Sequence, residues 1–105
     1  MARRLRWAEA AWGDLEEAAD FIARDSPNYA AAFVREVRDA ARSLHHFAER
    51  GRVVPELADL SIREIFVQGY RLIYQVSPDI VYVVGLIHGA RDLRSIWGRE
   101  GRGGR

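Results

Sequence analysis

The sequence predicts an α+β fold in which an N-terminal β-strand and an α-helical hairpin pack on a three- to four-stranded antiparallel sheet. Two observations predict it: hydrophobic residues recur at helical spacing through residues 8–47, and they alternate as in strands from residue 62 onward. The 105 residues, 49% of them hydrophobic, suffice for one domain with one core. We expect residues 1–97 to form this domain and residues 98–105, rich in Gly and Arg, to be a flexible tail.

The first half of the chain contains the elements of the hairpin. Residues 3–7 are compatible with an edge strand, and residues 8–22 have the apolar spacing of an amphipathic helix. Ser26 and Pro27 predict the start of a second helix, because serine caps helix N-termini and proline fits the first helical position. Gly51 is expected to end this helix. Its apolar stripe consists of Ala30, Phe33, Val34, Val37, Ala41, Leu44 and Phe47.

The second half of the chain contains the sheet. After a connector at residues 53–60, the strands are expected at residues 62–67, 70–76 and 80–87. The last of these strands is apolar on both faces, which predicts a position inside the sheet. A short helix is expected within residues 88–97, and the turn between the first two strands is Gln68-Gly69. Since no further element remains, we expect the sheet face opposite the hairpin to be exposed and to carry the function.

The composition excludes several classes of chemistry. The chain has no cysteine, which excludes disulfides, thiolate nucleophiles and cysteine-based zinc sites. All 16 basic residues are Arg, which excludes a lysine base. Phosphate-binding glycine loops, nucleophile-elbow serines and histidine pairs at metal-binding spacing are absent from the sequence, so no cofactor and no metal is expected. The N-terminus lacks a long apolar run, which favours a cytoplasmic protein without membrane association.

Charged residues of the second half form the candidate site. Residues 60–105 contain seven Arg and four acidic residues, whereas the whole chain has a net charge of only +1. The candidates are Arg63, Arg71, His88, Arg91 and Asp92. On a sheet face, Arg side chains with a histidine at the rim suit bidentate binding of a phosphate or a carboxylate. The alternative is structural: Arg71 pairs with Asp92 or with a helix acid and fixes the C-terminus.

Two stretches of the second half are distinctive: residues 63–76, REIFVQGYRLIYQV, and residues 84–93, VGLIHGARDL. Both closely resemble the RelE/ParE toxins. The order of the elements agrees as well, so the resemblance spans essentially the whole chain. It implies a toxin of a type II toxin–antitoxin system with the fold described above.

The resemblance leaves two activities open. RelE-like members cut messenger RNA on the ribosome, and they have alternating basic residues on the first strand of the meander. This chain has Glu64 and Phe66 at those positions, Gly89 after the histidine where an arginine is usual, and Leu93 where a tyrosine is expected. Arg71 is common to both branches. These departures favour the ParE branch, whose members bind DNA gyrase, a type II topoisomerase.

The resemblance also implies partners and contact residues. A cognate antitoxin is expected to wrap the hairpin and the sheet groove, and toxin and antitoxin can assemble as a heterotetramer. The expected antitoxin contacts are Phe33, Val37, Leu44 and Phe66. The expected target contacts are Arg63, Arg71, His88, Arg91 and Trp97. If the chain is instead a ribosome-dependent nuclease, the catalytic candidates are Arg71, His88 and Arg91, with ribosome and mRNA as partners. A third reading is a relative that binds its partner and poisons nothing.

Overall fold

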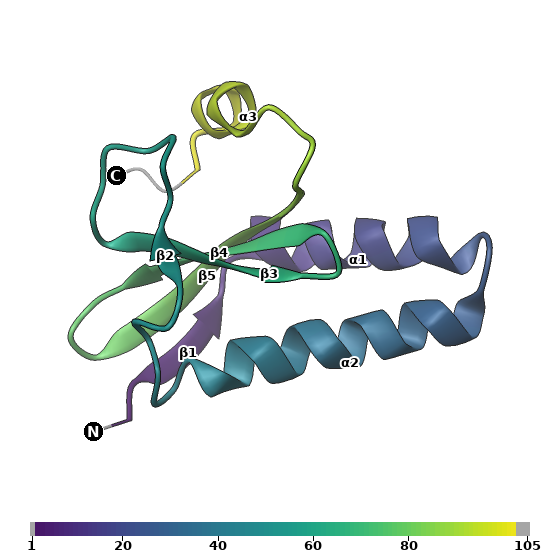
Figure 1. Ribbon diagram of the computed structural model, residues 1–105, viewed down its shortest axis with the longest axis horizontal. Helices are drawn as coiled ribbons and strands as arrows, with labels where there is room; N and C mark the ends of the chain where they lie inside the picture. The colour runs from purple at the N-terminus through teal and green to yellow at the C-terminus, as the bar shows by residue number, and fades with distance from the viewer. Residues whose placement is uncertain (1, 103–105) are drawn as a thin grey trace.

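The computed structural model describes residues 2–102, and within them it contains five strands and three helices (Figure 1). In chain order these elements are β1 (Arg4–Trp7), α1 (Glu9–Ala23), α2 (Pro27–Ser43), β2 (Arg52–Val53), β3 (Ile62–Val67), β4 (Tyr70–Val76), β5 (Ile80–His88) and α3 (Leu93–Glu100). The α+β class and the order of the elements are confirmed. None of the helices in the described part of the chain has the length and apolar character needed to cross a membrane.

The sheet is larger than expected and it is mixed. Its strand order is β1-β5-β4-β3-β2. β1 runs parallel to β5, whereas β2, β3, β4 and β5 pair antiparallel with their neighbours. The additional strand, β2, is only two residues long, and its second residue, Val53, is the first residue of the segment expected to be a connector. The position of β5 between two neighbours agrees with its apolar character on both faces.

The start of the second helix follows the sequence prediction, but its end does not. The Ser26 hydroxyl accepts a hydrogen bond from the Tyr29 amide at 3.1 Å, and Pro27 is the first helical residue. The helix ends at Ser43 instead of near Gly51. The reason is a tertiary contact: the buried Tyr74 hydroxyl donates to the Ala48 carbonyl at 2.8 Å and accepts from the Gly51 amide at 3.0 Å. These bonds satisfy the backbone of a folded loop in place of helical hydrogen bonds.

The hairpin covers one face of the sheet (Figure 1). Its buried residues form one apolar cluster with the inward-facing residues of the strands, as the helical and alternating patterns predict. Among the members from the helices are Leu15, Phe33 and Val37, and among those from the strands are Leu72 and Tyr74.

The opposite face of the sheet is also covered, so the expectation of an exposed face is wrong. In Figure 1, α3 lies on the side of the sheet away from α2. A second apolar cluster is buried there, and it contains Val54, Ile62, Ile73, Val84, Ile87, Leu93, Ile96 and Trp97. The physical reason is that the connector and α3 each contribute a few apolar side chains, too few to produce a clear periodicity but enough to cover a short sheet.

The C-terminal residues differ from the expected tail. Residues 98–100 form the last turn of α3, and Gly101 ends it with a φ of 67°, in the left-handed region that glycine adopts without strain. Arg102 then turns back and pairs with Asp14 of α1. Residues 103–105 of the expected tail lie outside the described residues.

Candidate functional site

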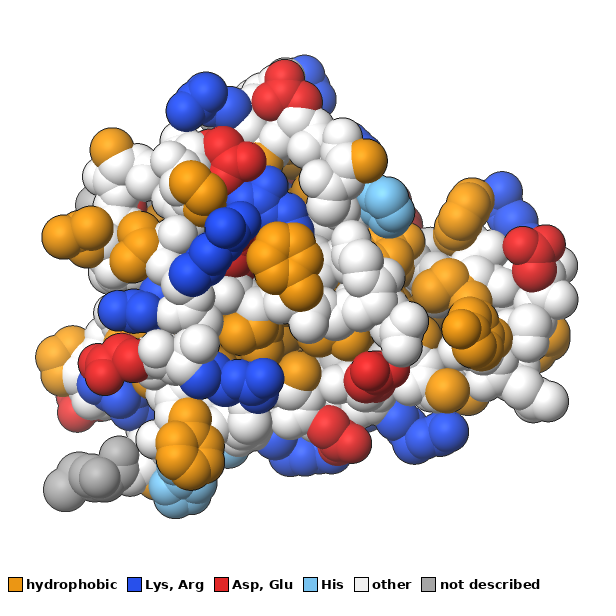
Figure 2. All heavy atoms as spheres, in the orientation of Figure 1, with side chains coloured by type: hydrophobic (Ala, Val, Ile, Leu, Met, Phe, Trp, Pro, Cys, Tyr) orange, Lys and Arg blue, Asp and Glu red, His pale blue; other side chains and the backbone are white. Residues whose placement is uncertain are grey.

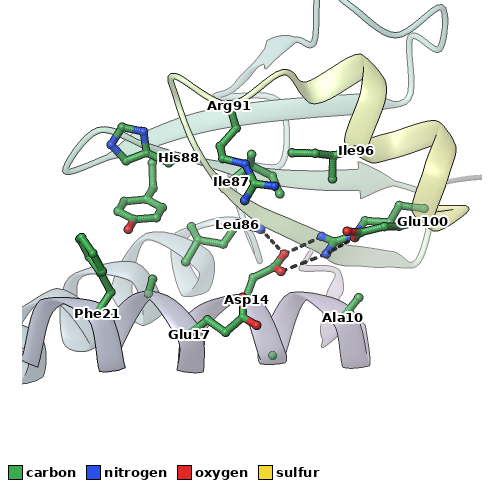
Figure 3. A pocket seen from close by; sticks show the side chains of 14 residues that line it. Ala10, Asp14, Glu17, Phe21, Leu86, Ile87, His88, Arg91, Ile96 and Glu100 are labelled. Carbon is green, nitrogen blue, oxygen red and sulfur yellow. Dashed lines mark hydrogen bonds and ion pairs between the residues drawn. The ribbon is translucent and has the colours of Figure 1, made fainter.

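A groove of about 530 Å³ lies between α1, the end of β5 and α3, and we call it the His88 groove (Figure 3). It contains two of the predicted site residues, His88 and Arg91, which are exposed. The other residues that form its walls are Ala10, Gly13, Asp14, Glu17, Ala18, Phe21, Tyr70, Leu86, Ile87, Ile96, Glu100 and Arg102. The groove therefore brings together His88 and Arg91, from the end of β5 and the loop after it, with residues of α1 from the other half of the chain.

Asp14 lies at the centre of this groove and closes an open sheet edge (Figure 3). β1 pairs with β5 only as far as Val83, and an irregularity at Val84 shifts the register of β5. The Leu86 amide, beyond the end of β1, donates instead to the Asp14 carboxylate at 3.0 Å. Both terminal nitrogens of Arg102 also donate to Asp14, at 2.5 and 2.9 Å, and these bonds raise the Arg102 pKa above its usual value. Asp14 thus joins α1, β5 and the C-terminal segment.

Two charged groups of the groove have no such partner. Within residues 2–102, the side chains of Arg91 and Glu17 form no hydrogen bond or ion pair. Figure 3 shows Arg91 pointing from the loop after β5 toward the space between β5 and α1. The His88 ring accepts a hydrogen bond from the Ala90 amide through Nδ1 at 3.2 Å and contacts Tyr70 edge to face, with centroids 5.2 Å apart. Arg91 is therefore free to bind a carboxylate or a phosphate.

An apolar socket of about 240 Å³ continues the groove toward the tip of the hairpin. It shares Phe21, Tyr70 and His88 with the groove. Phe21 and Tyr29 are 63% and 66% exposed, although both are large aromatic residues. In Figure 2, hydrophobic side chains gather at the hairpin end of the visible face. An exposed aromatic patch of this kind is typical of a protein-binding surface.

Arg71 does not lie in the groove but is buried beside the connector, on the sheet face that α3 covers. Its Nε donates to Glu64 at 2.6 Å, and its two terminal nitrogens donate to Glu56 of the connector at 2.9 and 2.6 Å. The side chain of Arg71 is 5% exposed and that of Glu64 is 0% exposed. The hydrogen bonds from Arg71 lower the Glu56 pKa, and the same bonds raise the Arg71 pKa. Every guanidinium nitrogen of Arg71 is thus occupied.

Arg71 therefore has the structural role that the sequence offered as an alternative, an ion pair within the protein, but its partners differ from those expected. Glu64 and Glu56 take the place of the expected partners, Asp92 or a helix acid, and Asp92 instead caps α3 by accepting from the Ser95 amide at 3.4 Å. The ion pairs fix the connector on the sheet and not the C-terminus, which Arg102 holds.

The predicted target contacts do not form one surface. Arg63 donates to the Gly51 carbonyl at 2.6 Å and supports the loop before β2. Trp97 is 7% exposed and belongs to the second apolar cluster. Only His88 and Arg91 lie together, because they emerge from the same end of β5.

The predicted antitoxin contacts are divided between core and surface. Phe33, Val37 and Leu44 are 4%, 0% and 0% exposed and pack inside the hairpin-side cluster. Phe33 also contacts the apolar socket through Tyr70, with ring centroids 5.1 Å apart. Phe66 is 56% exposed, and the Arg52 guanidinium lies 5.4 Å from the centroid of its ring.

Sequence reasoning missed Asp14, Arg102 and Glu56, which organise the charged parts of the molecule. Asp14 and Arg102 are 88 residues apart in the chain, and no local pattern connects them. For Glu56, the available signal was weak, because the connector also contains a second acidic residue, Asp59. Within the described residues, no three His, Asp or Glu side chains are grouped so that they could hold a metal ion.

Comparisons with known proteins agree with this architecture. Residues 5–93 match the model of the family described as ParE toxin of type II toxin-antitoxin system, parDE. Toxin RelE2 of Caulobacter vibrioides is 35% identical over 86 residues, which are 81% of this chain and 93% of the relative.

Two solved structures share the fold at lower identity. One is from the chromosomal ParDE toxin–antitoxin system of P. aeruginosa, with a TM-score of 0.69 and 17% identity over 83% of this chain and 96% of the other. The second is from the toxin–antitoxin complex RelBE2 of Mycobacterium tuberculosis, with a TM-score of 0.59 and 20% identity over 84% of this chain and 99% of the other. Together with the family match, these similarities show that the chain belongs to the ParE/RelE family of toxins of type II toxin–antitoxin systems.

Proposed function

We propose that this toxin acts in the cytoplasm by binding and inhibiting DNA gyrase, and that a cognate antitoxin neutralises it. The observation that carries the proposal is the burial of Arg71 and its pairing with carboxylates. This residue is common to both branches of the family, yet here it is buried and bonded to two carboxylates. A toxin that acts by binding alone does not need a free arginine at this position.

Cleavage of a phosphodiester has requirements that this surface does not meet. A transition state that accumulates negative charge is stabilised by cationic groups placed in advance around it. Glu64 and Glu56 neutralise Arg71, and Phe66 on the neighbouring strand is uncharged. The net charge of +1 also provides little long-range attraction to ribosomal RNA.

The His88 groove and its apolar socket suit a flexible partner segment, which we propose to be the antitoxin. A narrow concave surface is filled most readily by a chain that folds as it binds. An apolar side chain would enter the socket beside Phe21 and Tyr29, and an acidic side chain would bind Arg91. This assignment replaces Val37 and Leu44, whose side chains are buried in the hairpin-side cluster, with exposed residues at the tip of the hairpin.

A supercoiling assay with purified gyrase tests the proposal. Increasing amounts of the toxin should slow the supercoiling of relaxed plasmid, and addition of the protein encoded beside the toxin gene should restore it. An Arg91→Glu variant should still inhibit gyrase but resist this rescue, since the antitoxin loses its ion pair. Undisturbed gyrase activity at saturating toxin would exclude gyrase as the target.

The alternative is a ribosome-dependent nuclease. It is favoured by the 35% identity to a relative named Toxin RelE2 and by the exposure of His88 and Arg91 at one end of β5. In that case His88 would act as general acid or base and Arg91 would bind the phosphate. Primer extension on messages from a translation extract distinguishes the two functions. We expect intact transcripts, whereas cleavage at the ribosomal A site that disappears in a His88→Ala variant would establish the nuclease.

A further inference from the structure

A second exposed surface lies at the opposite edge of the sheet, where β2 begins beside β3. We call it the Arg52 edge and define it by Arg52, Glu64 and Phe66. Figure 2 shows basic side chains gathered around an exposed hydrophobic side chain over this end of the sheet. Phe66 is 56% exposed, and Arg52 has 59% of its side chain exposed. Neither residue belongs to the His88 groove.

The Arg52 side chain is held in one orientation. Its Nε donates at 2.6 Å to Glu64, whose other carboxylate oxygen accepts from the buried Arg71 at 2.6 Å. Its guanidinium lies over the Phe66 ring at 5.4 Å from the centroid, a cation–π distance. Within residues 2–102, the two terminal nitrogens of Arg52 form no hydrogen bond. They form a fixed fork of the kind that binds a carboxylate bidentately.

The backbone at the same position is also open. The Val54 amide donates to the Ile62 carbonyl, so alternation along β3 directs the N–H and C=O groups of Glu64 and Phe66 toward β2. However, β2 begins at Arg52, which pairs with Glu64. Among the described strands, none pairs with β3 beyond this point on that side. The amide and carbonyl of Phe66 are therefore available to one residue of an added strand.

We infer that the Arg52 edge binds an acidic extended segment on the surface of the folded target protein. The segment would pair with the Phe66 backbone, cover the Phe66 ring and place a carboxylate on the Arg52 fork. The inference rests on the proposed function, in which the target is gyrase. The hydrogen-bonding groups are complementary, because Nε of Arg52 is bound to Glu64 while its two terminal nitrogens remain open to the two oxygens of a carboxylate.

The form of the surface distinguishes the target from other partners. An open strand edge with a fixed guanidinium can contact a folded protein without either backbone rearranging, whereas the concave His88 groove requires a segment that inserts. A nucleic acid cannot form the backbone hydrogen bonds of a strand. Glu64 and Glu56 balance the charges of Arg52 and Arg71, so this edge has no row of unpaired cations for successive phosphates, whereas one carboxylate needs only the Arg52 fork.

The test uses two variants with matched controls. Arg52→Glu reverses the charge of the fork, and Arg38→Glu is its control, since Arg38 also lies over an aromatic ring, that of Trp12 at 5.8 Å on the hairpin. Phe66→Ser removes the exposed ring, and Phe47→Ser is its control, with Phe47 65% exposed. Thermal unfolding of all four variants identifies any loss of folding. The readouts are growth arrest at equal expression, affinity for gyrase, and affinity for the antitoxin.

We expect Arg52→Glu and Phe66→Ser each to weaken gyrase binding at least tenfold and to relieve growth arrest, while antitoxin affinity stays within about twofold and both controls behave as the wild type. Gyrase binding unchanged in both variants would overturn the inference and leave the proposed function intact. If the wild type arrests growth without binding gyrase, and the two variants no longer arrest growth, then gyrase is rejected as the target. The Arg52 edge would still be supported as the surface that binds the target. Growth arrest that persists in both variants would reject the Arg52 edge as the target-binding surface. The edge would also be rejected as a protein-binding surface if the wild type binds a labelled 20-nucleotide RNA and the Arg52→Glu variant does not.

Discussion

The two faces of the sheet are covered by different means. On the hairpin face, two long helices bury an apolar cluster through a repeating pattern of side chains. On the other face, a short helix and a connector cover a smaller apolar cluster, and the ion pairs of Arg71, which is buried, and of Arg102, which is partly buried, fix these segments in place. The comparison shows that burial of apolar surface stabilises the position of the two long helices. The connector and the C-terminal segment depend for their position on a few specific charged contacts.

The energetics of the two faces differ accordingly. Apolar burial contributes about 25 cal/mol per Å² and does not depend on the precise geometry of any one residue. A buried ion pair gains little net stability, since desolvation offsets the attraction, but loss of one partner leaves a charge buried without compensation. We therefore expect the α3 face to respond more sharply to single charge deletions than to apolar truncations.

The largest effect is expected from Arg71→Met. It leaves the Glu64 carboxylate, which is 0% exposed, with Arg52 as its remaining partner. We expect the free energy of unfolding to fall by about 3–5 kcal/mol, as for other buried pairs that lose one member. Urea denaturation measures it. The double variant Arg71→Met with Glu64→Leu should recover most of the loss, and a single variant as stable as the wild type would show that the pair is not buried in solution.

Truncation of one leucine on each face compares the two apolar clusters directly. Leu44 and Leu93 are 0% and 1% exposed. We expect Leu44→Ala to cost about 3 kcal/mol and Leu93→Ala about 2 kcal/mol, because α3 can shift into the cavity more easily than the hairpin can. Denaturant unfolding of both variants gives the difference. A larger loss for Leu93→Ala would reverse the proposed ranking of the faces.

Asp14→Asn tests the contact that joins the two faces. The neutral side-chain amide of asparagine cannot replace the charge-assisted hydrogen bonds between Asp14 and Arg102. We therefore expect the free energy of unfolding to fall by about 2 kcal/mol. Hydrogen exchange of the Leu86 amide, which donates to Asp14, should become faster. Glu17→Gln, one turn further along α1 and without a partner in residues 2–102, is the control and should change stability by less than about 0.5 kcal/mol. Equal behaviour of the two variants would contradict a joining role.

The smallest effect is a pH dependence at Glu56. Its pKa in the folded protein lies below the value of 4.5 expected in the unfolded chain, because Arg71 hydrogen-bonds to its charged form. The contribution of Glu56 is therefore present above pH 4.5 and is lost as the pH falls through the lower folded value. The difference in unfolding midpoint between the wild type and Glu56→Gln should shrink on acidification. A difference that is constant from pH 7 to pH 3 would exclude this ion pair.

The sequence predicted the hairpin side more completely than the α3 side. Ser26 and Pro27 marked the start of α2, and Gln68-Gly69, with φ values of 51° and 80°, formed the tight turn between β3 and β4. These features are local, and local geometry is encoded within a few residues. The exposed sheet face was predicted incorrectly because Val54 and Trp97, which help to cover it, lie in segments without a regular period.

For the site, the sequence identified His88 and Arg91 but grouped them with residues that lie elsewhere. Arg63 and Arg71 belong to the other stretch that resembles the toxin family, residues 63–76, and the pleat and the strand order direct their side chains to other partners. The residues that complete the His88 groove come from α1, which is more than 60 residues away in the chain.

By itself, the sequence determined the class of the fold, the order of its elements and the membership of a toxin family, because periodicity and motifs are properties of neighbouring residues. Only the tertiary structure decided which arginines are free. A guanidinium can bind a partner only if the folded chain has not already placed carboxylates beside it that occupy its hydrogen-bond donors. That placement paired Arg71 with Glu56 and Glu64, oriented Arg52 outward and left Arg91 without an acid.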